Sequence, residues 1–313
     1  MSDVIRVESL VKVYGDNSRV GPISLTVKKS EVYGLVGPNG SGKTTTIRAI
    51  LGLLRPTSGK VSVLGRNPFN NPAEVNALIG YSPEVPIFPP FFSARKLLEV
   101  NCKLGGLSRR EAECRISEVL DLTGLVEHAD RKIGNFSKGM VQRLSIGQAL
   151  IADPEILLLD EPMLGVDPIG RVKIRDVVLE LKRRGKTVLF SSHELYEVER
   201  LSDRMGMVYM GKMVLEGGVD ELLSRYEMGS RVLATVKRDL DPGVIDSLKS
   251  IDGVLSVNVE GRRLTIGIDG ANNPSDKIAE VLVTSGCGLE ELRPLNPSLE
   301  DVFVKVVKGD VNR

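Results

Sequence analysis

A glycine-rich octapeptide between a strand and a helix is the feature that most constrains how this chain can fold. Its sequence, Gly37-Pro-Asn-Gly-Ser-Gly-Lys43-Thr44, matches the pattern of a loop that wraps around phosphate groups. Glycines let successive backbone N–H groups turn inward, and the helix predicted over residues 43–54 begins directly at the loop. We therefore predict that residues 37–44 bind phosphate, with Lys43 as the counter-charge and the Thr44 hydroxyl as a ligand of Mg²⁺.

A second motif supplies two acids. Residues 156–160 form a continuous apolar run that ends in acid, as expected of a buried parallel strand, and Glu161 follows it. Ligands of α/β proteins bind at the carboxyl ends of such strands. Asp160 is therefore predicted to hold Mg²⁺, and Glu161 to polarise an attacking water as a general base. Acids often follow strands without any such role, so this motif depends on the phosphate loop for its meaning.

A third motif lies about twenty residues before Asp160. It is Asn135-Phe-Ser137-Lys-Gly139-Met-Val-Gln-Arg, in which Ser137 can cap the helix that follows. A capped helix leaves backbone N–H groups that can bind an anion, although capping alone requires no ligand.

The order of strands and helices predicts two domains. The chain has 313 residues, and strands and helices alternate from the N-terminus to about residue 228. A helical insert interrupts this α/β domain over about residues 86–152. Residues 229–313 follow the order β-α-β-β-α-β, the split βαβ pattern of ferredoxin-like domains.

Composition excludes some classes of function. The net charge of +1 and the lack of a basic tract argue against a nucleic-acid binder. The longest stretch without Asp, Glu, Lys or Arg has eleven residues, 32–42, where a membrane span needs about 20. The N-terminal residues show no signal peptide, and the three cysteines make no CxxC pair, which favours a reducing compartment.

Together the motifs resemble the ATP-binding subunit of an ABC transporter, over roughly residues 3–220 and in the family's order. The resemblance implies an ATPase with a P-loop NTPase fold, bound ATP and Mg²⁺, and ATP held between two subunits, most simply a homodimer. Within the family, the sequence of the third motif is similar to that of ABC-2-type and drug-resistance exporters.

The resemblance also assigns roles. Tyr14 falls where the family stacks an aromatic ring on adenine, residues 165–167 fall at the D-loop, and His193 at the switch histidine. Ser137 and Gly139 would contact the γ-phosphate bound by the partner subunit. The implied ATP-binding residues are Tyr14, Gly37, Pro38, Asn39, Gly40, Ser41, Gly42, Lys43, Thr44, Thr45, Ser137 and Gly139. The implied catalytic residues are Glu161 and His193, and the implied metal ligands are Thr44, Glu84 and Asp160.

Two departures from the family pattern stand out. Lys138 and Met140 replace a glycine and the glutamine of the common signature, and Glu84 stands where the family usually has a glutamine. A carboxylate still binds Mg²⁺ or water. The substitution at Glu84 bears on the timing of coupling rather than on binding.

A transport subunit without a membrane span implies a separate transmembrane permease and a peripheral location on the cytoplasmic face of the membrane. The segment 86–92, with Phe88, Phe91 and Phe92, is the candidate docking surface; these rings could instead pack the core of the helical insert. Two other functions remain open: a soluble ATP switch acting on nucleic acid or ribosomes, and a regulator that hydrolyses ATP slowly. The C-terminal unit is either a regulatory or dimer-stabilising module or a plain accessory domain, and its segment 297–303 resembles the closing segment of ABC-2-type ATPases.

Overall fold

The chain forms two compact units. The computed structural model describes residues 2–15, 18–225, 231–269, 273–295 and 298–311. One unit comprises Met1–Val219 and the other Asp220–Arg313. The boundary expected between residues 228 and 229 falls within 226–230, outside the described residues. Each unit has its own cluster of buried apolar side chains.

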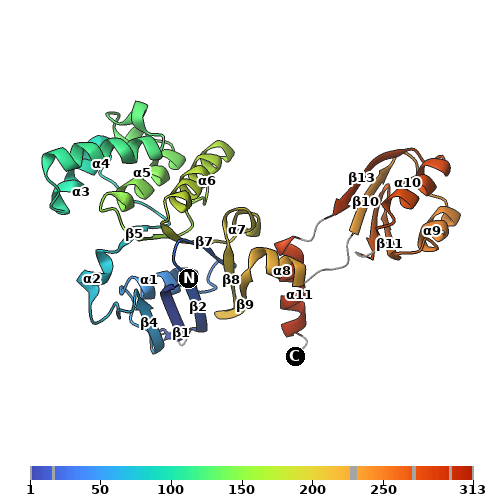
Figure 1. The fold of residues 1–313 in the computed structure, drawn as a ribbon, viewed down its shortest axis with the longest axis horizontal. Helices are drawn as coiled ribbons and strands as arrows, with labels where there is room; N and C mark the ends of the chain where they lie inside the picture. The colour runs from blue at the N-terminus through green and yellow to red at the C-terminus, as the bar shows by residue number, and fades with distance from the viewer. Residues whose placement is uncertain (1, 16–17, 226–230, 270–272, 296–297, 312–313) are drawn as a thin grey trace. The chain divides into compact units, whose positions relative to one another are not determined.

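A six-stranded sheet forms the centre of the first unit (Figure 1). Its strands, in spatial order, are β5 (Ile79–Ser82), β6 (Ile156–Leu159), β7 (Thr187–Ser192), β3 (Val32–Val36), β8 (Arg204–Tyr209) and β9 (Lys212–Gly218). All neighbours are parallel except β8 and β9. Every residue of β3 and β6 is buried, as their continuous apolar sequences require. Parallel pairing brings the loops that follow β3, β5, β6 and β7 to one edge of the sheet.

A three-stranded antiparallel sheet completes this core, in the order β2 (Arg19–Lys28), β1 (Asp3–Val13) and β4 (Ser58–Val63). Helix α1 (Lys43–Ile50) packs against β1 and β4. The helix is shorter than the expected 43–54. It ends at Ile50 because Gly52 takes a left-handed backbone, with φ +73°, that a helix cannot continue through.

The expected helical insert is present between β5 and β6 (Figure 1). Its main helices α3, α4 and α5 begin after Ser93, Ser108 and Ser137, whose hydroxyls accept from the third residue of each helix. The insert comprises α3 (Ala94–Leu104), α4 (Arg109–Leu122), the short 3₁₀ helices η1 (Val126–His128) and η2 (Ile133–Asn135), and α5 (Lys138–Leu150). Three further helices of this unit are α2 (Pro72–Asn76), α6 (Pro168–Arg183) and α7 (Leu195–Leu201).

The second unit has the predicted β-α-β-β-α-β order. Its antiparallel sheet runs β11-β12-β10-β13, so β11 and β13 lie at the edges. The elements are β10 (Arg231–Val236), α9 (Pro242–Lys249), β11 (Val254–Glu260), β12 (Arg263–Ile268), α10 (Ser275–Thr284) and β13 (Leu289–Leu295), with α8 (Val219–Arg225) and α11 (Leu299–Val311) at the ends. Of the closing segment 297–303, Pro297 lies outside the described residues, and Leu299–Phe303 begin α11.

Candidate nucleotide-binding site

The predicted phosphate loop joins β3 to α1. Gly42 precedes α1 with φ +113°, a conformation that side chains disfavour, and a Cβ at Gly37 would collide with the carbonyl of Val208. The loop is therefore pressed against β8 on one side and opens to a pocket on the other. The Ser41 hydroxyl is buried and has no hydrogen-bond partner among the described residues. An unsatisfied hydroxyl beside a helix N-terminus fits a phosphate oxygen.

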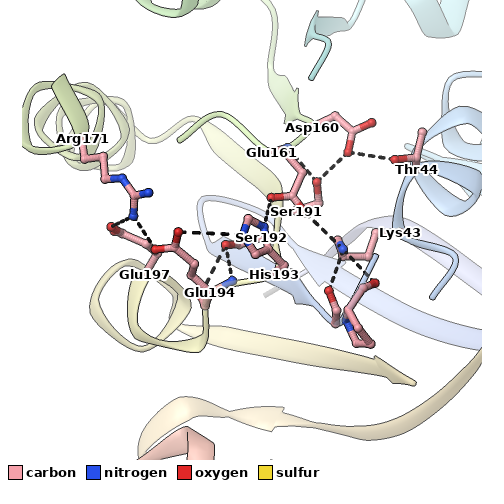
Figure 2. Close-up of polar contacts among 12 residues, drawn as sticks. Lys43, Thr44, Asp160, Glu161, Arg171, Ser191, Ser192, His193, Glu194 and Glu197 are labelled. Atoms are coloured by element: carbon pink, nitrogen blue, oxygen red, sulfur yellow. Dashed lines mark hydrogen bonds and ion pairs between the residues drawn. The ribbon is translucent and has the colours of Figure 1, made fainter. Parts of the chain in front are cut away.

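Lys43 is folded back over this loop. Its side chain is nearly buried, and Nζ donates to the carbonyl oxygens of Gly37 at 2.6 Å and Pro38 at 3.2 Å. The same Nζ lies 3.1 Å from Oε1 of Glu161 (Figure 2). The ammonium group of Lys43 thus makes two hydrogen bonds and one ion pair within the chain.

Asp160 follows β6 and meets two hydroxyls. The Thr44 hydroxyl donates to Oδ1 of Asp160 at 3.3 Å, and the Ser191 hydroxyl donates to the same oxygen at 2.6 Å. Thr44 and Asp160 thus lie together, as the metal prediction requires (Figure 2). A hydroxyl and a carboxylate are oxygen ligands of the kind Mg²⁺ takes alongside phosphate and water.

Glu161 is held by both its backbone and its side chain. Its φ of +46° lies in the left-handed region that non-glycine residues rarely adopt, and its N–H donates to the Ser191 hydroxyl at 2.8 Å. Its Oε2 lies 2.8 Å from Nδ1 of His193, which follows β7 (Figure 2). An ionised carboxylate only accepts hydrogen bonds, so we assign the proton to Nδ1 of His193.

The phosphate loop and Glu161 border a pocket of about 470 Å³, a volume in the range of small-molecule sites. Tyr14 lies at its rim, where its hydroxyl is 2.9 Å from Oγ1 of Thr45. Of the three predicted metal ligands, Thr44 and Glu84 border the pocket, and Asp160 lies behind Thr44, whose hydroxyl donates to it. The lining residues are Tyr14, Ser18, Arg19, Val20, Asn39, Gly40, Ser41, Gly42, Lys43, Thr44, Thr45, Glu84 and Glu161.

Tyr81, in β5, stays uncharged near the site. Burial, followed by the charge of Asp160, raises the pKa of Tyr81 to about 12. The Tyr81 hydroxyl therefore keeps its proton at neutral pH and adds no negative charge near the site.

Ser137 and Gly139 are the predicted ATP contacts that lie outside both the phosphate loop and the pocket lining. Ser137 caps α5, and Gly139 in its first turn lies against the 165–170 segment, where a Cβ would meet Cγ1 of Val166 at 3.1 Å. Neither Ser137 nor Gly139 is one of the described residues that line the pocket. This placement is what a site completed by a second subunit would need.

Sequence reasoning missed several neighbours of the site. The role of Ser191 depends on the pairing of β6 with β7, which no local pattern predicts. Arg19 and Val20 follow Tyr14 on the β1–β2 hairpin and border the pocket. Arg171 and Glu194 extend the polar contacts beyond His193; only their places near the D-loop and switch positions hinted at them.

The phosphate loop, the two acids that follow β6 and the histidine that follows β7 define a P-loop ATPase site. The family description "ABC transporter" matches residues 20–164. The chain is 36% identical to the bacitracin transport ATP-binding protein BcrA of Bacillus licheniformis, over 99% of both chains. It is 35% identical to the linearmycin resistance ATP-binding protein LnrL of Bacillus subtilis, over 97% of this chain and 98% of the relative. The chain therefore belongs to the ATP-binding, ATP-hydrolysing subunits of ABC transporters.

Solved structures support the same family assignment. A structure described as the ATP-binding subunit of an ABC transporter superposes with a TM-score of 0.64 at 29% identity, covering 71% of this chain and 93% of that one. A third sequence relative, the daunorubicin resistance ATP-binding protein DrrA3 of Streptomyces coeruleorubidus, is 31% identical over 98% of this chain and 96% of its own. These relatives give no support to a switch acting on nucleic acid or ribosomes. Within the described residues, the helices lack the length and apolar character needed to cross a bilayer.

Proposed function

We propose that this chain powers an exporter of ABC-2 type by hydrolysing Mg²⁺-ATP between two copies of its first unit. The observation that carries the proposal is the contact of Glu161 with both Lys43 and His193, at 3.1 and 2.8 Å. The names of the relatives, which concern antibiotic transport and drug resistance, support export as the direction.

The residues around the phosphate loop have separate roles in binding and hydrolysing ATP. The backbone of residues 37–42 and the Ser41 hydroxyl bind phosphate oxygens, and Tyr14 stacks on the base. Thr44 and Asp160 hold Mg²⁺, with Glu84 bordering the same pocket. When bound, Mg²⁺ neutralises phosphate charge as the transferred group leaves. Glu161 accepts a proton from the attacking water, and His193 keeps its carboxylate in place.

The active form we propose is a dimer, preferably of identical chains. Ser137 and Gly139 lie at the start of α5, away from the pocket of their own chain. A second copy that presents these residues to the bound γ-phosphate completes the site and excludes water.

The membrane partner we propose is a separate permease, which places the chain at the cytoplasmic face of the membrane. The segment after Glu84 exposes apolar side chains: the exposed fractions are 88% for Ile87 and 69% for Phe91. Phe88 and Phe92 are half-buried, so only part of the segment 86–92 is free to dock. Crosslinking from position 91 to a co-expressed permease tests this surface; no crosslink in any nucleotide state would argue against it.

The test of the ATPase proposal is turnover and oligomer size in Mg²⁺-ATP, for wild type and Glu161→Gln. Loss of a general base lowers kcat by about 10²–10⁴-fold, and we expect the variant to accumulate as an ATP-bound dimer. Glu155→Gln is the matched control, because Glu155 is exposed just before the opposite end of β6. Equal turnover in wild type and Glu161→Gln would remove Glu161 as the base.

A further inference from the structure

Arg171, on the first turn of α6, joins two loops that flank the candidate site. Its Nε donates to the carbonyl oxygen of Val166 at 3.0 Å, in the loop that leads from Glu161 to α6. Its guanidinium also donates to the carboxylate of Glu194, the residue after His193 (Figure 2). One rigid, planar group therefore spans the loop after β6 and the loop after β7.

The contact with Glu194 bears on the orientation of His193. The backbone N–H of Glu194 donates to the Ser192 hydroxyl at 3.0 Å, which closes a tight turn around His193. Glu194 Oε1 lies 3.9 Å from Nε2 of His193, while Nδ1 of His193 faces Glu161. The two ring nitrogens thus face two carboxylates, and Arg171 fixes the second of these.

Arg171 also pairs with another carboxylate, that of Glu197. Glu197, in the first turn of α7, has a nearly buried side chain, and its Oε1 lies 3.8 Å from the Arg171 guanidinium. Arg175, one turn further along α6, lies 3.6 Å from the other oxygen of Glu197. Within the described part of the chain, Arg175 makes no hydrogen bond or ion pair with Glu194 or Val166. The two arginines therefore share Glu197, and only Arg171 reaches the two loops.

We propose that Arg171 is a positioning residue for ATP hydrolysis. By tying Val166 to Glu194, it holds His193 with Nδ1 toward Glu161, and a shift of either loop changes that alignment. This inference rests on the proposed roles of Glu161 and His193. It assigns to Arg171 no contact with the nucleotide, so its loss should change kcat and leave the KM for ATP nearly unchanged.

The test compares Arg171→Lys with the matched control Arg175→Lys. Lysine keeps the positive charge beside Glu194 and Glu197, but its single nitrogen cannot reproduce the fork that reaches two loops. We expect Arg171→Lys to lower kcat by roughly ten- to a hundredfold, the scale of a misplaced catalytic group. Arg175→Lys should keep wild-type kcat, and chemical denaturation should show both variants folded.

A second readout is independent of turnover. The chain has only 2 histidines, His128 and His193, so the imidazole ¹⁵N signals of the nucleotide-free protein can be assigned by substitution. In wild type and Arg175→Lys, we expect His193 to carry its proton on Nδ1. In Arg171→Lys, we expect either the other tautomer or changed ¹⁵N chemical shifts for His193. The signals of His128, on the 3₁₀ helix η1 of the helical insert, should stay fixed in all three.

The outcomes separate the inference from the function on which it rests. Unchanged His193 signals in Arg171→Lys would overturn the positioning role, whether or not the protein hydrolyses ATP. Changed signals without any turnover in wild type would support the control of His193 orientation by Arg171 and refute the ATPase proposal. In the His193→Ala background, Arg171→Lys should cause no further loss of kcat; an equal loss there would show that Arg171 acts by another route.

Discussion

A single hydroxyl connects the two acids of the candidate site. Ser191 is fully buried, donates to Asp160 at 2.6 Å and accepts from the N–H of Glu161 at 2.8 Å. The second bond supports the left-handed backbone of Glu161, which aims its side chain at Lys43 and His193. At the scale of residues, the site therefore depends on a side chain that touches both acids and is assigned no contact with the substrate.

Replacement of Ser191 by alanine should reduce turnover while the fold persists. The change leaves the Glu161 N–H buried without a partner, which costs about 1–3 kcal/mol. If that loss is felt in the transition state, kcat falls by roughly five- to 150-fold. Steady-state ATP turnover and chemical denaturation, measured together, test this expectation.

Thr187→Val is the control for Ser191→Ala. Thr187 begins the same strand, is buried, and accepts from the Ser30 N–H at 2.9 Å, far from the two acids. Both variants should lose comparable stability, and only Ser191→Ala should lose turnover. A similar kcat for the two variants would show that Ser191 serves the fold alone.

At the scale of elements, helix α5 is fitted closely onto strand β5. The Ser82 hydroxyl lies 2.8 Å from that of Ser145, and Gln142 also reaches Ser82, at 3.5 Å. The backbone carbonyl of Ser82 accepts from the N–H of Asp160. Strand β5 is thereby bonded on one side to the helix that Ser137 caps and on the other to the strand that carries Asp160.

Gly80 lies at this contact, and its replacement by alanine should destabilise the first unit. An added Cβ would press on the carbonyl of Ala149 and lie 2.9 Å from Cγ of Pro154. Overpacking of this kind costs about 1–3 kcal/mol, measurable as a lower midpoint of urea unfolding. Gly15→Ala is the control, since a Cβ there would meet nothing within 4 Å. Equal midpoints for the two variants would contradict the close fit.

The sequence predicts elements better than their contacts. The phosphate loop, the acidic end of β6 and the serine cap of α5 follow from local patterns, and the structure places each on the expected element. The end of α1 at Ile50 depended on the backbone of Gly52. Contacts such as those of Ser191 and Arg171 depend on which strands and loops become neighbours, and one sequence alone carries little information on that.

At the scale of the whole molecule, the two units have separate cores. The apolar cluster of the second unit is built from its own strands and helices, such as Val232, Ile266 and Ile278. The predicted order of its elements was sufficient to indicate a ferredoxin-like sheet. The position of β3 between β7 and β8 in the first unit, by contrast, requires crossovers that the order of elements leaves open.

A chain that ends after residue 225 should still bind nucleotide. Every residue that we assign to ATP, from Tyr14 to His193, belongs to the first unit. We expect calorimetry to give the same dissociation constant for ATP in the truncated and full-length proteins. A large loss of affinity in the soluble, folded truncated protein would mean that the second unit contributes to the site.

The folded-back Lys43 has a consequence for selectivity. The ammonium group of Lys43 already contacts two carbonyl oxygens and Glu161. An anion that binds to Lys43 must therefore displace these partners. A lone inorganic phosphate offers few compensating contacts. A nucleotide brings a base and a chain of phosphates that engage the remainder of the loop. Lys43 therefore favours a nucleotide over inorganic phosphate. The larger molecule makes further contacts that offset the bonds Lys43 gives up, and negative charge alone does not.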